Sequence, residues 1–161
     1  MLELEVNAER ALAAAHRAPA LLVQELDKAI DVSLHHMART AKGYAPKFNS
    51  TLTNSIGVER PSRLEGLVTV GAAYGIYVEQ GVEPGSYPNV GNIRDWVLSM
   101  GLRPLYSDPD ADTWDIAWAI SRAISYRGLP ARPFLEPAFV EHQDDTERRL
   151  DAAIDIALEA A

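Results

Sequence analysis

The sequence predicts an α+β fold, with a small antiparallel or mixed β-sheet, a long helix packed across it, and additional helices that include the C-terminal one. Two observations lead to this prediction. Apolar residues recur every three or four positions over residues 19–43 and again over 137–161, as in amphipathic helices. Between them, short apolar runs alternate with turn residues, as strands do. We expect residues 1–161 to form a single domain.

An N-terminal arm of residues 1–18 precedes the predicted long helix of residues 19–43. Within the arm, residues 2–6 alternate in the manner of a strand, and a short Ala-rich helical stretch follows. Pro19 separates that stretch from the long helix, since a residue before proline avoids the helical region. The predicted apolar face of the long helix consists of Leu22, Leu26, Ala29, Ile30, Ser33, Met37 and Ala41.

Three short strands are expected after the long helix. They lie near residues 57–60, 67–71 and 74–80, and the polar stretch 45–56 before them is expected to be irregular. In the third strand, Tyr74, Ile76 and Val78 share one face. The sequence therefore predicts a small sheet under the long helix.

Glycine and proline predict two exposed loops, at residues 81–92 and 101–112, with a short helix between them. The second loop leads into another helix. Asp112 is its expected N-cap, and Asp115 three residues later completes a pattern close to a capping box. This helix is expected to end at Arg127, before a glycine.

The composition argues against several classes of protein. The formal net charge is −8, from 23 acidic and 15 basic residues, so sequence-specific DNA binding is not expected. The chain has no cysteine, which excludes disulfides and thiol chemistry. We find neither a leader-like segment nor an apolar run of the roughly 20 residues that span a bilayer. No membrane partner is expected.

Two sequence features could suggest a metal site. The alternating acids of residues 108–112 resemble the start of an EF-hand loop, but its sixth and twelfth positions are Thr113 and Ala119 rather than glycine and glutamate. His35 and His36 are adjacent, and neighbouring helical residues point about 100° apart. The sequence therefore predicts no metal ligand.

An enzymatic function is not expected either. The sequence lacks a Gly-x-Ser-x-Gly elbow, a phosphate-binding loop and a dinucleotide fingerprint. Glu79 and Glu83 are the one pair of carboxylates that could act as acid and base, and no nucleophile accompanies them. We expect a hydrogen-bonding role for Glu79, no catalytic residue and no cofactor.

The most distinctive feature is a series of short motifs in a fixed order: Ala-Lys-Gly-Tyr-Ala-Pro (41–46), Ser-Thr-Leu-Thr-Asn-Ser-Ile (50–56), Val-Thr-Val-Gly (68–71), Tyr-Gly-Ile-Tyr-Val-Glu-Gln-Gly (74–81), Trp96, and Gly-Leu-Pro-Ala-Arg-Pro-Phe-Leu-Glu-Pro-Ala (128–138). This order resembles the neck or minor-tail-component family of lambdoid siphophages and their prophages. Ser50-Thr51 replaces the family's Thr-Gly, and Gly81-Val82 replaces its Gly-Thr.

Sixteen positions carry this resemblance: Pro46, Leu52, Ser55, Ile56, Gly71, Tyr74, Tyr77, Glu79, Gly81, Trp96, Gly128, Arg132, Pro133, Phe134, Leu135 and Pro137. Among them, Phe134 and Leu135 are expected to be core residues. Arg132 is expected to anchor the chain as it enters the last helix, and Glu79 is its suggested partner.

The resemblance implies a structural virion protein, a subunit of a neck ring that joins the head, through portal, adaptor and stopper proteins, to the tail. Its partners would be copies of itself, these head-completion proteins, and tail-terminator or tail-tube proteins. Genomic DNA would pass through the lumen without specific binding. The chain would be assembled in the host bacterial cytoplasm and end up in the virion. Alternatives are a tail terminator or tail-completion protein, a small hydrolase, or a binding module that inhibits a host protein.

The candidate subunit interface combines the loop residues Val82, Tyr87 and Val90 with the helix residues Trp114 and Trp118. The two tryptophans form a ridge about 140° around the helix from the ridge of isoleucines that would seat this helix on its own sheet. Either the C-terminal helix of the same chain or a neighbouring subunit could cover that ridge.

Overall fold

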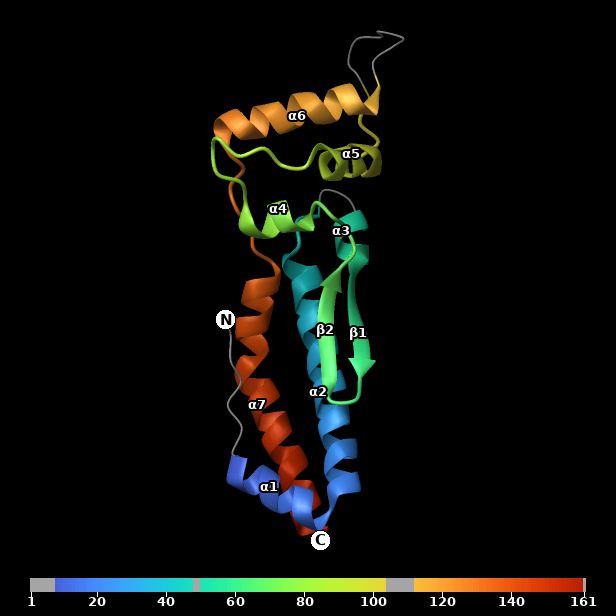
Figure 1. Ribbon diagram of the computed structural model, residues 1–161, viewed down its shortest axis with the longest axis vertical. Coiled ribbons are helices and arrows are strands. Elements are labelled where there is room, and N and C mark those ends of the chain that lie inside the picture. Colours follow the sequence, from blue (N-terminus) through green and yellow to red (C-terminus); the bar gives the residue numbers. More distant parts are fainter. Residues whose placement is uncertain (1–7, 48–49, 104–111, 161) are drawn as a thin grey trace. The chain divides into compact units, whose positions relative to one another are not determined.

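The computed structural model describes residues 8–47, 50–103 and 112–160 (Figure 1). The predicted α+β class is confirmed, because the described residues form helices and one two-stranded antiparallel sheet. By their contacts they fall into two compact units. Unit 1 comprises the residues up to Gly43, the hairpin residues 57–69, and the residues from Leu135 onwards. Unit 2 comprises residues 44–56 and 70–134.

Unit 1 contains three helices and a β-hairpin. The helices are α1 (Ala8–Arg17), α2 (Pro19–Tyr44) and α7 (Leu135–Glu159), and the strands are β1 (Ile56–Ser62) and β2 (Glu65–Val70). Figure 1 shows α7 and the hairpin running beside α2, while α1 packs on α7. The predicted long helix and C-terminal helix are therefore both present.

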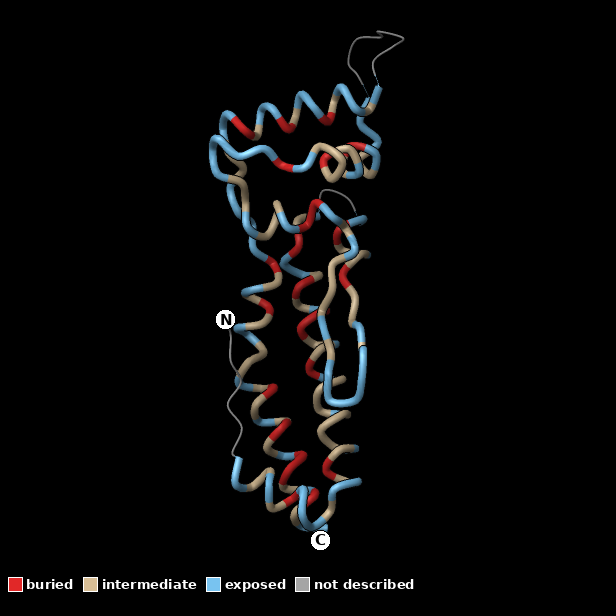
Figure 2. The backbone as a smooth tube through the Cα atoms, in the orientation of Figure 1, coloured by how far each residue is buried: buried red, intermediate tan, exposed pale blue. Residues whose placement is uncertain are grey.

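The apolar core of unit 1 joins its three helices. Part of it is a cluster of Ala14 from α1, Leu22 from α2, and Ile154 with Ala157 from α7. Further along α2, Met37 is also buried, and in Figure 2 the buried positions of α2 and α7 recur at helical spacing. Four of the five buried residues of α2 belong to the predicted apolar face, and the fifth, Ala38, was not predicted, so periodicity identified the correct side of this helix.

Arg60 of β1 fastens the hairpin to α2. Its guanidinium group pairs with the Asp27 carboxylate and lies 3.4 Å from that of Asp31, while its Nε donates to the carbonyl oxygen of Glu65 at 2.9 Å. At Gly66 of β2, an added Cβ would clash with Cδ1 of Leu34. The hairpin thus covers part of α2 outside the predicted apolar face.

Unit 2 is helical. Its elements are α3 (Ser50–Ser55), α4 (Gly75–Gln80), α5 (Val90–Ser99) and α6 (Thr113–Arg127). Helices α5 and α6 pack against each other around the buried side chains of Ile93, Val97 and Ala117. Partly buried hydrophobic side chains surround this cluster: Tyr77, Val90, Trp96, Ile116, Ile120 and Ile124.

The capping box predicted for α6 is confirmed. The Asp112 carboxylate caps the first turn and accepts from the backbone N–H of Thr113, while the backbone N–H of Asp112 donates to the Asp115 carboxylate at 3.0 Å. Hydrogen bonds from the side chain and backbone of Thr113 hold the pKa of Asp112 below its usual value. The helix ends at Arg127, as predicted, before Gly128 with its positive φ of 74°.

The predicted strand at residues 74–80 is wrong, because Gly75–Gln80 forms helix α4. Tyr74 is buried and Tyr77 and Val78 are half-buried, whereas Ile76 is exposed, so inward positions recur every three or four residues. Gly75 is also buried, and an added Cβ would lie 2.8 Å from Cγ1 of Val70. In so short an apolar run, the two-residue period of a strand cannot be distinguished from the three-to-four-residue period of a helix.

Three further boundaries differ from the predictions. Ser50–Ser55 is helical, although its Ser, Thr and Asn residues have modest helix propensity. The C-terminal helix begins at Leu135, before Pro137, because proline is tolerated in a first turn where N–H groups lack helical partners. The first loop ends at Asn89, since Val90 begins α5.

The predicted N-terminal strand, most of the second loop and the first acids of the EF-hand-like segment lie outside the described residues.

The core of unit 1 can be tested by two substitutions on α7. Ile154 is 1% exposed and Ile156 is 47% exposed. Replacing Ile154 by alanine should lower the free energy of unfolding by roughly 2–5 kcal/mol, because it leaves a cavity at the contact with α1 and α2. The control Ile156→Ala should stay within about 0.5 kcal/mol of the parent in urea unfolding followed by circular dichroism. Equal losses for both variants would contradict this packing.

Candidate functional site

Residues from five of the six sequence motifs meet around one apolar pocket in unit 2. The pocket has a volume of about 310 Å³. Its lining consists of Pro46, Leu52, Tyr74, Val78, Trp96, Leu129, Pro130 and Arg132. Positions that are more than 80 residues apart in the sequence therefore contribute to one surface, which gives the motif series a common structural setting.

Tyr74 is the most buried aromatic side chain of this pocket, at 5% exposure. Burial raises the pKa of its hydroxyl group, and hydrogen bonds to the Ser99 side chain and the Leu52 backbone partly offset that rise. Nearby, the Ser55 hydroxyl donates to the Leu52 carbonyl oxygen at 2.8 Å, and the Gly71 N–H donates to the Ser55 carbonyl oxygen at 3.0 Å. These motif residues thus hold the pocket wall together.

Beside the pocket, residues around Val82 are hydrogen-bonded to residues around Leu129, an arrangement that we call the chain crossing. Val82 and Leu129 form an isolated antiparallel bridge, with N–H to carbonyl oxygen distances of 2.9 and 2.8 Å in the two directions. The Arg132 N–H then donates to the carbonyl oxygen of Val78 at 2.8 Å. The segment that leads into α7 is therefore bonded to the end of α4 by its backbone.

Glycine is required on both sides of this crossing. Gly81 has φ of 72°, and an added Cβ would lie 2.6 Å from the Leu129 carbonyl oxygen. Gly128 has φ of 74°, and its Cβ would lie 2.9 Å from the Val82 carbonyl oxygen. Both positions combine a left-handed φ with contact to rigid backbone, which larger residues cannot accommodate without displacing it.

Glu79 adds a side-chain bond to the same segment. Its carboxylate accepts a hydrogen bond from the backbone N–H of Phe134 at 2.7 Å, and the Phe134 side chain is fully buried. A carboxylate bonded to a backbone N–H makes one of the stronger types of hydrogen bond. Glu79 is thus placed to hold the chain in position just before α7, while its suggested pairing with the Arg132 side chain stays a prediction.

The other motif residues have varied surroundings. Ile56 is buried, Leu135 is half-buried at the start of α7, and Pro133 is exposed. The Tyr77 hydroxyl accepts from the Asn89 N–H at 2.8 Å, immediately before α5 begins. Pro137 lies in the first turn of α7. Most of these contacts are structural, and none of them brings a nucleophile to Glu79 within the described residues.

The outer face of α6 carries a stripe of exposed aromatic side chains. Trp114, Trp118 and Tyr126 are 43%, 57% and 68% exposed, and Tyr87 of the loop between α4 and α5 is 61% exposed. In Figure 2 the buried positions of α6 lie on the side toward α5 and the exposed ones on the opposite side. The other residues of unit 2 leave both tryptophan rings substantially exposed.

Two arginines extend this stripe. The Arg94 guanidinium lies 4.8 Å from the ring centroid of Trp114, and that of Arg122 lies 5.8 Å from the ring of Tyr126. A shallow groove of about 450 Å³ is lined by Tyr87, Trp118, Ala119, Arg122 and Tyr126. We name the set Trp114, Trp118, Arg122, Tyr126 and Tyr87 the aromatic stripe.

Arg122 and Tyr126 were not among the residues singled out from the sequence. Their spacing could have revealed them, because Trp114, Trp118, Arg122 and Tyr126 recur every four residues along one helix. Of the three loop residues expected to grip a partner, Tyr87 alone is exposed. Val82 is bonded in the chain crossing, and Val90 packs in the core of unit 2.

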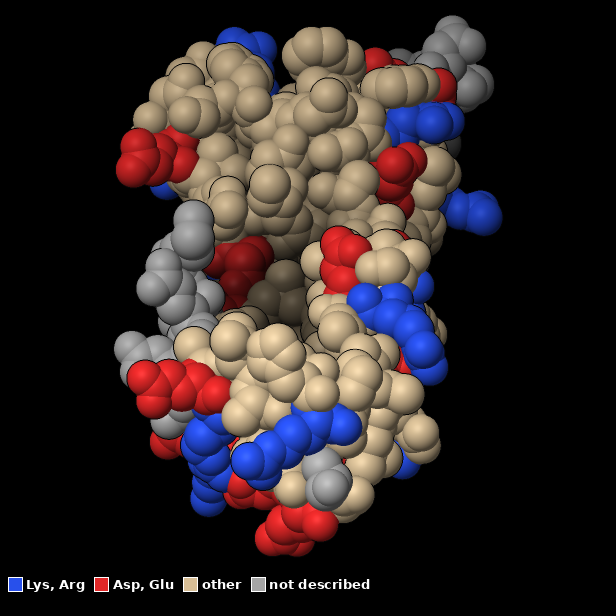
Figure 3. All heavy atoms as spheres, turned by 60° about the horizontal axis from the view of Figure 1, so that its bottom comes forward, with Lys and Arg blue, Asp and Glu red and all other residues tan. Residues whose placement is uncertain are grey.

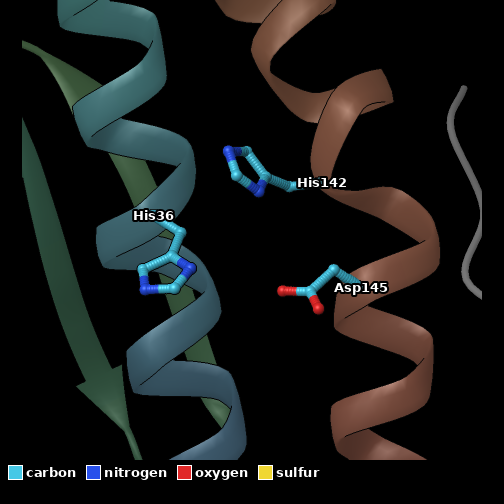
Figure 4. Close-up of side chains that lie close together, drawn as sticks. All are labelled: His36, His142 and Asp145. Carbon is cyan, nitrogen blue, oxygen red and sulfur yellow. The ribbon is translucent and has the colours of Figure 1, made fainter.

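A second group of polar side chains lies in unit 1. His36 of α2 faces His142 and Asp145 of α7 (Figure 4), and their candidate ligand atoms all lie within 4.8 Å of one another. The two imidazole rings are 5.9 Å apart between centroids. Sequence reasoning considered His36 only with His35. The three-residue spacing of His142 and Asp145, which places both on one face of a helix, was the signal that it missed.

Acidic and basic side chains are interspersed on the face drawn in Figure 3, which shows no extended basic patch among the described residues there. Such mixing, with a net charge of −8, does not provide the clustered cations that phosphate binding requires. Across the described parts of the chain, the helices are too short or too polar to traverse a bilayer.

In comparisons with known proteins, no family model, no curated protein and no solved structure matches the chain.

The chain crossing predicts a specific hierarchy of glycine substitutions. Gly85 also has a positive φ, of 93°, but open space surrounds the position of its Cβ. Gly85→Ala should therefore cost about 1–2 kcal/mol of stability from its backbone conformation alone. Gly81→Ala should cost more, because its methyl group also displaces Leu129. Thermal unfolding of the two variants measures the difference, and equal melting temperatures would refute a tight crossing.

Glu79 can be tested by comparing two substitutions. Glu79→Ala should lower the free energy of unfolding by roughly 1–3 kcal/mol, because it leaves the Phe134 N–H without this acceptor. Glu79→Gln keeps an acceptor oxygen and should lose less. Chemical denaturation of both variants gives the order. A larger loss for glutamine than for alanine would show that the hydrogen bond is not what Glu79 contributes.

Proposed function

We propose that this chain is a non-enzymatic structural subunit of a tailed-phage virion and forms part of a ring at the neck, where head meets tail. Two independent observations support the proposal. The ordered motifs over residues 41–138 resemble those of neck and minor-tail-component proteins. The aromatic stripe presents an exposed surface of the composition that protein interfaces use. The second observation carries the proposal, because it comes from geometry alone.

The residue types of the stripe favour a protein partner. Tryptophan, tyrosine and arginine are enriched among the interface residues whose replacement by alanine weakens binding most, by about 2 kcal/mol or more. Exposing two tryptophan rings and two tyrosine rings in water is unfavourable, at roughly 25 cal/mol per Å² of apolar surface. A neighbouring subunit that covers them would recover this free energy.

The stripe is also partly ordered before any partner arrives. The Arg94 guanidinium group stacks over Trp114, and its Nε donates to the Thr113 hydroxyl at 3.0 Å. Two contacts therefore hold this side chain in one orientation. Arg122 similarly lies over Tyr126. Because fewer rotamers have to be frozen on association, more of the contact energy remains for binding.

In a ring, each copy contacts the next through two different surfaces. The stripe of one copy would lie against another surface of its neighbour, as a head-to-tail contact requires. Portal, adaptor, stopper and tail-terminator or tail-tube proteins would contact the faces of the ring above and below. With a net charge of −8, the lumen would let genomic DNA pass without specific binding.

The proposal assigns no reaction and no cofactor to the chain. Glu79, the carboxylate that sequence reasoning weighed as a catalytic acid, accepts a hydrogen bond from the Phe134 N–H and supports the backbone instead. A small hydrolase or an inhibitor of a host protein has no specific observation in its favour in the described residues.

Substituting the stripe tests the function. In a phage or prophage that carries this gene, the double variant Trp114→Ser, Trp118→Ser should lower the yield of infectious particles at least about tenfold, as expected from losing 1.4 kcal/mol or more of association energy. The purified variant should retain its helical circular dichroism. The matched control is Leu12→Ser, which removes an equally exposed apolar side chain from α1.

Electron microscopy of the defective lysate separates the related functions. Loss of a neck ring should leave filled heads and finished tails unjoined, whereas loss of a tail terminator should leave tails of irregular length. A normal yield from the double variant, or equal losses from Leu12→Ser, would disprove the assembly role of the stripe.

A further inference from the structure

We propose that His36, His142 and Asp145 form a binding site for a zinc-like divalent transition-metal ion between α2 and α7. This inference is independent of the proposed neck function, because all three residues belong to unit 1, whereas the aromatic stripe belongs to unit 2.

The geometry brings the donors together from two helices. His142 and Asp145 are three residues apart on α7, so their side chains leave the same face of the helix, and His36 comes from the facing side of α2 (Figure 4). Their candidate ligand atoms lie within 4.8 Å of one another. Metal–ligand bonds of about 2.0–2.2 Å place ligand atoms roughly 3–3.5 Å apart, so small side-chain rotations close the site.

The donor set selects the class of ion. Two imidazole nitrogens and one carboxylate oxygen suit zinc, cobalt, nickel or copper, whereas calcium and magnesium prefer oxygen ligands alone. Three protein ligands also leave a fourth position for water, as in open zinc sites. All three side chains are half-buried, so solvent reaches the site while the helices restrict its geometry.

Thr40 supplies the outer contact that metal-binding histidines usually have. Its hydroxyl oxygen lies 2.7 Å from Nε2 of His142. When Nε2–H donates to Thr40, the lone pair of His142 is on Nδ1, which is then the nitrogen that binds the ion. A hydrogen bond at the nitrogen that does not bind the metal fixes the tautomer and the orientation of a ligating imidazole.

The third ligand, Asp145, has competing partners. The hydrogen bond from Arg149 holds the pKa of Asp145 below its usual value. Arg149 Nε is 2.8 Å from Oδ2, and Arg148 Nη2 is 3.7 Å from Oδ1. Metal binding by Asp145 therefore displaces or shares these contacts, and the two cations weaken the site.

Zinc alone is the probe for the test. Calorimetric titration of the intact chain with zinc chloride should show one ion per chain, and zinc should raise the melting temperature because it binds the folded state. His36→Gln and His142→Gln should each weaken binding by at least about tenfold, and Thr40→Val by about tenfold through the outer contact. Cobalt in place of zinc should give the visible absorption of a four-coordinate ion, which is lost in both histidine variants.

His35 provides the matched control, since it neighbours His36 but its side chain is 61% exposed on another face of α2. His35→Gln should bind zinc like the parent chain. The proposal is overturned if the parent binds no zinc, or if His35→Gln weakens binding as much as His36→Gln. Metal-free circular dichroism verifies that each variant is folded, and Asp145→Asn supplies a third ligand variant should one histidine variant unfold.

Discussion

The paired hydrogen bonds between Val82 and Leu129 organise unit 2. They bring two distant segments to a separation that only Gly81 and Gly128 permit, and the Glu79 carboxylate then holds the Phe134 N–H in place. Beside this crossing, motif residues between Pro46 and Arg132 line one apolar pocket. The C-terminal half of α6 is also attached to the loop before α5, because the Gly85 N–H donates to the Ser125 carbonyl oxygen at 2.7 Å and the Ser121 hydroxyl donates to the Pro88 carbonyl oxygen at 3.0 Å.

Long-range periodicity predicted the larger elements correctly. The apolar face of α2, the capping box of α6 and the C-terminal helix could all be identified, because each spans several helical turns or uses a cap with specific residue types. Short segments were harder. Residues 74–80 were interpreted as a strand, yet burial of Tyr74 and Gly75 against residues brought in from elsewhere favours a helical turn there. Tertiary contacts decide such segments, and the local pattern does not contain them.

The candidate sites show the same division. Trp114 and Trp118 could be identified from their helical angle and Tyr87 from its loop, and Arg122 follows on α6 at the same four-residue spacing. Arg94, by contrast, reaches Trp114 through the packing of α5 on α6, which the local pattern does not contain. The group of His36, His142 and Asp145 unites residues more than 100 positions apart, and no local spacing links α2 to α7.

The central claim is that the exposed face of α6 is a contact between subunits in a virion. Cryo-electron microscopy of tailed particles that carry this chain tests the claim most directly. The account predicts a ring at the neck in which Trp114 and Trp118 are covered by the adjacent copy. A ring in which both indole rings still face solvent, or infectious particles without any density for this chain, would contradict it.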